Sequence, residues 1–567
     1  MKHFKKIKEW FDKQEHLFYW FLMVLIVPNV VLCFTEPMPL TAKVCNVLLP
    51  FACYYILMTL SRNCGKIFWI LFPFIFLGAF QIVLLYLFGK SIIAVDMFLN
   101  LATTNSSEAL ELLDNLIPAI VIVVVLYIPT LISAMTSIIR KRLLTVDFIR
   151  RERKRAVWLL IIGGLSLTTA YVTDSRYELR SDLYPVNVCY NVVLAFQRDA
   201  KTREYDRTSK DFTFRAKSVH PQNEREIYVL VVGETSRALN WQLYGYEKDT
   251  NPELSKISNL TVFTNALTQS NTTHKIVPML MSGISSINFD FIYYQKGIIT
   301  AFKEAGFQTV FLSNQRRNHS FIDFFGMEAD TYNFIKEDST DSDYNPSDDE
   351  LLKLMKKELE KGVQKQFIVL HTYGSHFNYR ERYPQDKAVF MPDTPVDAEY
   401  KNRSSLLNAY DNTIRYTDDF LSRLIRMLKA EKANSAMLFT SDHGEDIFDD
   451  SRHLFLHASP VPSYYQLHVP LLVWTSDNYH KEYPERIVSL IKNRRKLVAT
   501  SSSVFHSLLE LGGIQTSYRQ DSLSVASSTF KEVPFYYLND HNEPCLLGDL
   551  GMGIADFQMF RQLRLRH

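Results

Sequence analysis

The sequence predicts a protein of two parts, a domain of five transmembrane helices and an α/β domain with a mostly parallel sheet flanked by helices. Long apolar runs dominate the first third of the 567 residues, and short strand-like segments alternate with amphipathic ones in the remainder. A chain of this length exceeds one domain. The change of pattern divides it into 1–172, a connector with membrane-surface helices over 173–222, and 223–567. The net charge of +2 says nothing about partners, and nucleic acid is not expected among them.

Five segments are apolar over the roughly 20 residues that a helix needs to cross a bilayer; they are 17–34, 42–60, 66–88, 116–138 and 155–172. One such segment alone would fit a buried helix of a soluble protein, but five in series favour a membrane domain. Basic residues precede the first segment and crowd the loop between the fourth and fifth, whereas the loops at 35–41 and 89–115 carry few. By the positive-inside rule, the N-terminus is expected in the cytoplasm and everything after about residue 173 outside it.

The pattern after residue 226 alternates strands with helices, which predicts a largely parallel sheet covered on both faces. The expected strands are 226–232, 261–265, 307–312, 366–371, 435–440 and 468–474. The expected helices are 252–258, 273–281, 294–305, 347–361, 404–430 and 501–511.

Metal-type side chains follow two of these strands. Asp442 and His443 come directly after the strand at 435–440, and Glu234 follows the strand at 226–232. In α/β folds, ligands bind at the carboxyl ends of the strands. Oxygen and nitrogen donors presented together suit a zinc-type ion, so the sequence predicts a metal site at this edge, with phosphoryl transfer as the first chemistry to test.

A run rich in hydroxyl groups, residues 268–274, leads into an apolar helical stretch that contains Pro278. Such a run is typical of a helix N-cap. The same run also fits a nucleophilic hydroxyl at a helix N-terminus, where the backbone N–H groups favour an incoming phosphate. A hydroxyl of that kind needs a metal ion or a neighbouring base to become reactive.

At this point the chain resembles the bacterial phosphoethanolamine transferases of the lipid A and lipopolysaccharide group, within the alkaline phosphatase/sulfatase superfamily. The resemblance covers nearly the whole length, and it is the order and combination of the motifs that make it specific. They are Val-Gly-Glu-Thr-Ser-Arg at 232–237, Tyr-Gly-Tyr at 244–246, the threonine-rich turn before Pro278, His-Thr-Tyr-Gly-Ser-His at 371–376, Asn-Ala-Tyr-Asp-Asn at 408–412 and Ser-Asp-His-Gly-Glu at 441–445.

The resemblance implies roles for particular residues. The family's zinc ligands match Glu234, Asp442 and His443, and its nucleophile, which also coordinates zinc, matches Thr273, with Thr272 as the alternative. Two histidines near the phosphoryl group match His376 and His457; they would hold a second zinc ion or stabilise charge, and His453 competes with His457 for this position. One zinc ion is therefore expected, and the presence of a second is open.

Residues around the lipid headgroup match Asn100, Thr104 and Glu108, which recur every four positions and so share a helix face, although an ordinary solvated face has the same pattern. Arg317 and His319 follow the strand at 307–312 and are candidates for binding phosphate oxygens. The family tends to have a lysine in this region, and a surface charge run is the alternative for the arginines.

By resemblance, the donor is phosphatidylethanolamine and the acceptor is lipid A or the lipopolysaccharide core. The enzyme would be a monomer in the bacterial inner membrane with its catalytic domain in the periplasm; polymyxin resistance is open. A phosphoglycerol transferase acting on envelope glycan or teichoic-type polymer is the alternative enzyme, and a non-catalytic membrane sensor or scaffold is the alternative of another class. A bridge between Cys189 and Cys545 cannot be inferred from the sequence.

Overall fold

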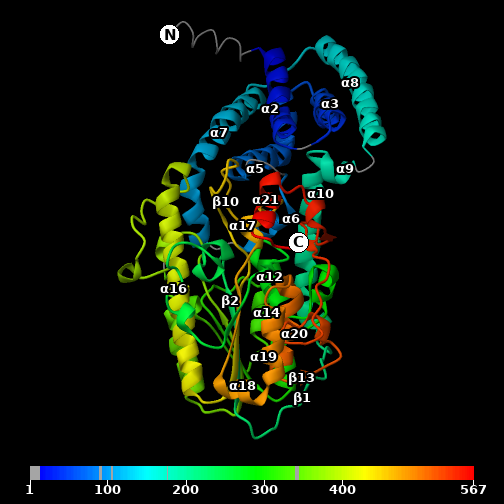
Figure 1. The fold of residues 1–567 in the computed structure, drawn as a ribbon. Helices are drawn as coiled ribbons and strands as arrows, with labels where there is room; N and C mark the ends of the chain where they lie inside the picture. Colours follow the sequence, from blue (N-terminus) through cyan, green and yellow to red (C-terminus); the bar gives the residue numbers. More distant parts are fainter. Residues whose placement is uncertain are drawn as a thin grey trace. The chain divides into compact units, whose positions relative to one another are not determined.

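The computed structural model describes residues 13–36, 38–88, 92–103, 106–174, 177–338 and 344–566, without the side chains of 87–88, 100–103 and 106–116 (Figure 1). The chain forms two compact units. The first combines Met1–Ala102 with Leu112–Arg198, and the second combines Thr103–Glu111 with Asp199–His567. The first unit therefore includes most of the connector at 173–222. All six cysteines, Cys189 and Cys545 among them, are free.

The first unit contains the predicted transmembrane helices. Among the described residues, four helices are long and apolar enough to cross a membrane, or five if one bent pair is a single span. They are α2 (Gln14–Thr35), α3 (Leu40–Met58), the pair α4 (Cys64–Ile70) and α5 (Phe72–Phe88), α7 (Ser106–Ile139) and α8 (Val146–Thr173). The bend of 62° within the pair follows from Pro73, because a proline inside a helix removes one backbone hydrogen bond and clashes with the preceding turn.

Two helices of the connector, α9 (Leu179–Asp182) and α10 (Val186–Arg203), pack on this bundle. Asn29 of α2 donates hydrogen bonds to the carbonyl oxygens of Asn46 and Tyr184, at 2.7 and 2.8 Å. Asn191 of α10 donates to the Ile93 carbonyl at 2.8 Å. These bonds satisfy buried backbone groups where the chain leaves the bundle.

The second unit is built on a seven-stranded sheet in the order β3-β11-β8-β2-β7-β5-β6. The strands are β3 (Leu260–Phe263), β11 (Leu471–Thr475), β8 (Asn434–Ser441), β2 (Glu226–Gly233), β7 (Lys365–His371), β5 (Gln308–Ser313) and β6 (Thr331–Phe334). The pairs β8–β2, β2–β7, β7–β5 and β5–β6 are parallel, and β11 runs antiparallel to both of its neighbours. The six expected strands are all present, and the mostly parallel sheet is confirmed.

Helices cover both faces of this sheet (Figure 1). On one face Tyr228, Leu230 and Val232 of β2 join a core with α12 (Thr273–Leu280) and α20 (Thr500–Leu511). Val229 and Val231 alternate with them and are also fully buried, so they point to the other face. That face carries the long helix α16 (Arg403–Ala430), and α15 (Asp349–Leu359) contacts both α16 and β5.

Some local predictions were wrong. The helix expected at 252–258 is only a 3-10 turn, Leu254–Lys256. The edge strand β6 was not predicted, because its four residues alternate polar and aromatic side chains and only Phe334 is buried. Helices of this unit that were not predicted include α14 (Phe321–Gly326), α17 (Tyr464–Leu467), α18 (Asp477–Glu482), α19 (Pro484–Asn493) and α21 (Ile554–Gln562).

Candidate active site

The strands of the central sheet bring the predicted metal ligands together. Gly233, the last residue of β2, is paired with Ser441, the last residue of β8. Glu234 and Asp442 are therefore the first residues after two neighbouring strands that end at the same level of the sheet. His443 comes directly after Asp442. Glu234, Asp442 and His443 are buried, and their ligand atoms lie within 4.8 Å of one another.

The hydrogen bonds in this cluster leave two acceptor atoms facing each other. His443 Nδ1 lies 2.9 Å from the Gly444 carbonyl oxygen, so this nitrogen carries the proton and Nε2 presents a lone pair. His443 Nε2 lies 3.2 Å from Asp442 Oδ2. That oxygen is buried and has no hydrogen-bond partner among the described residues, whereas Asp442 Oδ1 accepts from the N–H groups of Thr235 and His443. Such an arrangement fits a cation, and oxygen and nitrogen donors are those that zinc takes.

The electrostatics lead to the same conclusion. Burial, together with the nearby charge of Asp442, raises the pKa of Glu234 to about 8. Burial also raises the pKa of Asp442 to about 7 and lowers that of His443 to about 4. Two buried carboxyl groups side by side are costly when ionised, and a bound divalent cation would remove that cost.

The hydroxyl group of Thr273 touches this cluster. Thr273 is the first residue of α12, and its Oγ1 lies 3.2 Å from His443 Nε2 and 3.3 Å from Glu234 Oε1. The Thr272 hydroxyl instead contacts Ser270 Oγ at 3.1 Å. Of the two threonines that the sequence left open, only Thr273 has a described contact with the cluster. Its place at a helix N-terminus also favours an incoming phosphoryl group.

Two further histidines line the same site. The ring of His457 lies 4.1 Å from that of His443 and 6.2 Å from that of His376, measured between centroids. His376 Nδ1 donates to the Phe377 carbonyl oxygen at 2.6 Å, and His457 Nδ1 lies 3.0 Å from Glu445 Oε1. Burial lowers the pKa of His457 to about 4 and that of His376 well below its ordinary value. Both rings are therefore neutral. His376 Nδ1 faces a carbonyl oxygen, which can only accept, so His376 Nε2 presents a lone pair; His457 has the same tautomer when Glu445, whose pKa burial raises to about 8, is ionised.

His453, the competitor of His457, lies elsewhere. Its ring stacks on Tyr400 at 4.0 Å. The geometry thus favours His457 for the position near the phosphoryl group.

Three residues that sequence reasoning missed support the site. Gln315 donates to Glu234 Oε2 at 3.1 Å, and Tyr379 donates to Glu445 Oε2 at 2.6 Å, which orients Glu445 toward His457. Gln315 follows the end of β5, so the rule that polar residues gather at strand ends could have found it. Glu445 stood within a quoted motif without a role, and nothing in the pattern indicated Tyr379.

The proposed headgroup contacts have less support. The Arg317 guanidinium lies 5.7 Å from the Phe334 ring centroid and donates to Met327 Sδ. The described contact of His319 is its backbone N–H, which donates to Asp323 Oδ2 at 2.6 Å. Binding of phosphate by Arg317 and His319 stays a prediction that these positions do not support. Asn100, Thr104 and Glu108 fall outside the residues whose side chains are described.

The remaining motifs hold the loop that carries Glu234. Tyr410 donates to the Thr235 carbonyl oxygen at 2.7 Å and accepts from the Arg237 N–H at 2.9 Å. Arg237 is buried and pairs with Asp449 at 2.6 Å. Gly374 packs on the same loop with a φ of +51°, and a Cβ there would lie 2.7 Å from the Glu234 carbonyl oxygen. These residues therefore position the site.

The fold and this cluster define the class of protein. Residues 226–514 match the sulfatase family, and the chain belongs to that family. Among curated proteins, it is 27% identical over 335 residues to phosphoethanolamine transferase EptC of Escherichia coli K12 and 30% identical over 310 residues to EptA of the same strain. These matches cover 57% and 53% of this chain, and 57% and 56% of the relatives' own length.

Two solved structures are similar to this chain, one over part of its length and one over most of it. The zinc complex of the C-terminal periplasmic domain of EptC from Escherichia coli is 25% identical, with a TM-score of 0.54, and the match covers 60% of this chain and 97% of that one. The integral membrane lipooligosaccharide phosphoethanolamine transferase A from Neisseria meningitidis is 20% identical, with a TM-score of 0.69, and covers 90% of this chain and 97% of that one. The second likeness extends the shared fold over the membrane helices, so the chain is a multi-pass membrane protein.

Proposed function

We propose that this protein transfers phosphoethanolamine from phosphatidylethanolamine to lipid A or the lipopolysaccharide core. The observation that carries the proposal is the position of the Thr273 hydroxyl, at the N-terminus of α12 and within 3.3 Å of both Glu234 and His443. Relatives named phosphoethanolamine transferases support the choice of group.

The chemistry proceeds in two displacements. Zinc held by Glu234, Asp442, His443 and Thr273 would supply positive charge that lowers the pKa of the hydroxyl. Thr273 Oγ attacks the phosphorus of phosphatidylethanolamine, the bond between phosphorus and the glycerol oxygen breaks, and diacylglycerol leaves with a proton. The product is a phosphoethanolamine ester of Thr273. An acceptor hydroxyl then attacks the same phosphorus, the bond between phosphorus and Thr273 Oγ breaks, and the acceptor's proton passes to the threonine oxygen, which restores the hydroxyl.

The two histidines have a role in this scheme that follows from their tautomers. Because Nδ1 of His376 donates to a carbonyl oxygen, its Nε2 presents a lone pair, and His457 does the same when Glu445 is ionised. Each Nε2 can accept the proton of the attacking hydroxyl and return it to the leaving alcohol. The same lone pairs would serve a second zinc ion, whose presence metal analysis of the purified protein would decide.

The membrane domain tethers the catalytic unit to a membrane. The basic flanks of the apolar helices support an orientation with the N-terminus in the cytoplasm and the catalytic unit in the periplasm. Monomeric protein suffices for the scheme, because every side chain named in it belongs to one chain.

Mass spectrometry of lipid A and core oligosaccharide tests the proposal. Cells that express the protein should gain a species heavier by one phosphoethanolamine group, and cells that express Thr273→Ala should lack it. A phosphoglycerol increment would favour the alternative transferase, and unchanged lipopolysaccharide with both proteins present at equal amounts would contradict the proposed acceptor.

A further inference from the structure

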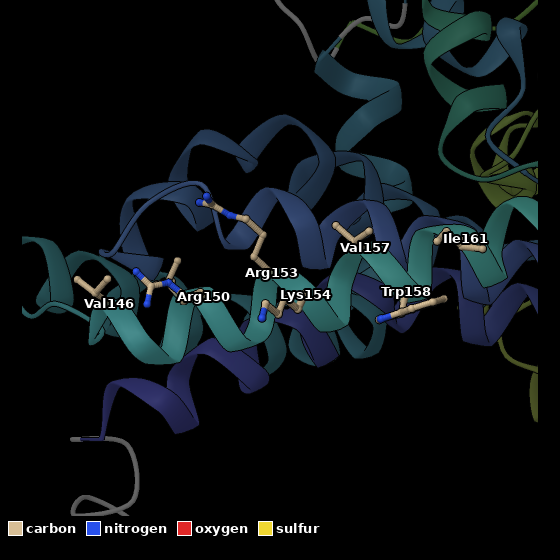
Figure 2. A pocket seen from close by; sticks show the side chains of 8 residues that line it. Val146, Arg150, Arg153, Lys154, Val157, Trp158 and Ile161 are labelled. Carbon is tan, nitrogen blue, oxygen red and sulfur yellow. The ribbon is translucent and has the colours of Figure 1, made fainter.

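A groove of about 650 Å³ runs along α8 in the first unit (Figure 2). All of its described lining residues belong to α8. The apolar Val146 and Ile149 begin the lining, the cations Arg150, Arg153 and Lys154 follow, and Val157, Trp158 and Ile161 complete it. Arg150, Lys154 and Trp158 are spaced by four residues, so they stand one above another on the same face of the helix.

The cations of α8 fall into two groups. Arg151 and Arg155 bind the buried carboxylate of Glu152 at 2.8 and 3.0 Å, and Tyr55 donates to the same carboxylate at 2.5 Å. Glu152 thus offsets part of the charge of these two arginines, and neither arginine lines the groove.

The second group keeps its charge. Arg150 faces a single carboxylate among the described residues, that of Asp147 at 4.0 Å, which is 95% exposed and therefore a weak partner. Lys154 has no ion pair within the part of the chain that the structure describes. Arg153 donates to the Thr59 carbonyl oxygen at 2.8 Å, which ties its side chain to the end of α3. Two cations one helical turn apart thus face the groove with uncompensated charge.

The apolar end of the groove is open to lipid. Only 17% of the apolar window of α8 is buried inside the protein. Trp158 is 67% exposed, and Val157 and Ile161 are each about half exposed. Tryptophan is enriched where a membrane helix passes from headgroups to hydrocarbon. Between Arg150 and Ile161, a distance of about 16 Å at a rise of about 1.5 Å per residue, the cations are followed by Val157, Trp158 and Ile161.

We propose that this groove binds one anionic diacyl phospholipid of the phosphatidylglycerol type. The phosphate lies between Arg150 and Lys154, and the acyl chains follow Val157, Trp158 and Ile161. The charge of the groove selects this occupant, because a zwitterionic lipid would bring its own ammonium group against two cations. The proposal rests on the membrane placement of α8 and is independent of the transfer reaction, whose site lies in the other unit.

Native mass spectrometry of the full-length protein released from detergent tests the site. Phosphatidylglycerol and, separately, phosphatidylethanolamine are titrated, and the fraction of protein that retains one lipid is measured. Arg150→Gln combined with Lys154→Gln should lower phosphatidylglycerol retention by about tenfold, since each cation near an anionic surface contributes appreciably, and should leave phosphatidylethanolamine retention unchanged. Trp158→Ala should weaken retention of the anionic lipid while the charge stays the same.

A matched control separates a site from general basic attraction. Arg140→Gln with Lys141→Asn removes two exposed cations next to α8 but outside the groove lining, and this variant should keep the retention of the wild-type protein within twofold. An equal loss in the control would overturn the proposal in favour of nonspecific charge. Equal retention of the two lipids by the wild-type protein would overturn it as well, because the groove would then be an ordinary lipid position. Melting temperatures in detergent check that all variants are folded.

Discussion

Thr273 Oγ1 lies 3.2 Å from His443 Nε2, although 170 residues separate the two along the chain. The contact joins the first turn of α12 to the residue pair that follows β8. One cation could therefore bind the Thr273 hydroxyl, the unprotonated ring nitrogen of His443 and the two carboxylates together. This relationship explains why the nucleophile and the metal ligands must be tested together.

Replacing the nucleophile separates its role from that of its neighbour. Thr273→Ala should lower transfer by about a thousandfold or more, as removal of a nucleophile does. Thr273→Ser, which keeps the hydroxyl, should retain activity within about tenfold of wild type. Thr272→Ala is the matched control, because that hydroxyl contacts Ser270 instead, and it should remain active. Transfer of phosphoethanolamine from labelled phosphatidylethanolamine is the measurement; an active Thr273→Ala protein would remove Thr273 from the mechanism.

The buried carboxyl groups predict how pH acts on the metal-free protein. The pKa of Glu234 is raised to about 8 and that of Asp442 to about 7, so their ionisation opposes folding. Stability from this source is complete below pH 4 and is lost as pH rises through 7 to 8. His443, whose pKa is lowered to about 4, acts in the opposite direction, but its effect ends near its ordinary pKa of about 6.5.

Between pH 6.5 and 8, therefore, the melting temperature of chelator-treated protein should fall, and above pH 8 it should level off. The decline should be smaller in Asp442→Asn, and zinc should restore the wild-type protein but not this variant. A flat profile between these pH values in the metal-free wild-type protein would contradict the placement of these carboxyl groups.

Glu445 is expected to act through His457. Its Oε1 lies 3.0 Å from His457 Nδ1, and Tyr379 fixes its other oxygen. Glu445→Gln should lower kcat by about 10- to 100-fold, the usual effect of losing a partner that orients a site histidine, with little change in KM. It should also shift the pH profile of kcat. Tyr379→Phe should give a smaller loss of the same kind, and an unchanged pH profile in Glu445→Gln would argue for a merely structural role.

Gly374 provides a steric test of the Glu234 loop. Alanine at this position would place Cβ 2.7 Å from the Glu234 carbonyl oxygen, in addition to the strain of a positive φ. Gly245 also has a positive φ, but a Cβ there meets open space. Gly245→Ala should therefore cost about 1–2 kcal/mol of strain and keep its activity, whereas Gly374→Ala should lose more stability and most of its activity. Comparable activity in the two variants would show that the close approach at Gly374 does not constrain the site.

Much of the fold could be predicted because the central strands are short apolar runs that can be recognised in the sequence alone. Apolar runs such as 226–232 and 435–440 are buried on both faces, so their composition alone identified them. Their direction has no such signature, and β11 was therefore not recognised as antiparallel. The short strand β6 and the helices after residue 476 are polar enough that their hydrophobic pattern is weak.

The site could be predicted in part for a related reason. Glu234, Asp442 and His443 follow strands directly, so the sheet itself determines where they lie. Gln315 and Tyr379 lie in loops, where the path of the backbone decides which side chain reaches the cluster. Arg317 is two residues from Gln315, yet it turns toward Phe334. Proximity in sequence to a strand end was not sufficient to assign it.

The pairing of Gly233 with Ser441 has a consequence for how this protein can vary. Surface loops in the long stretch of chain between these two residues can gain or lose residues without moving the strand ends, because the ladder fixes the level at which Glu234 and Asp442 follow β2 and β8. One residue inserted within β2 or β8 would instead turn a ligand toward the opposite side of the sheet. Insertions and deletions should thus be tolerated in the surface loops but should disrupt the site when they fall within β2 or β8. New segments can therefore be added to this protein in those loops.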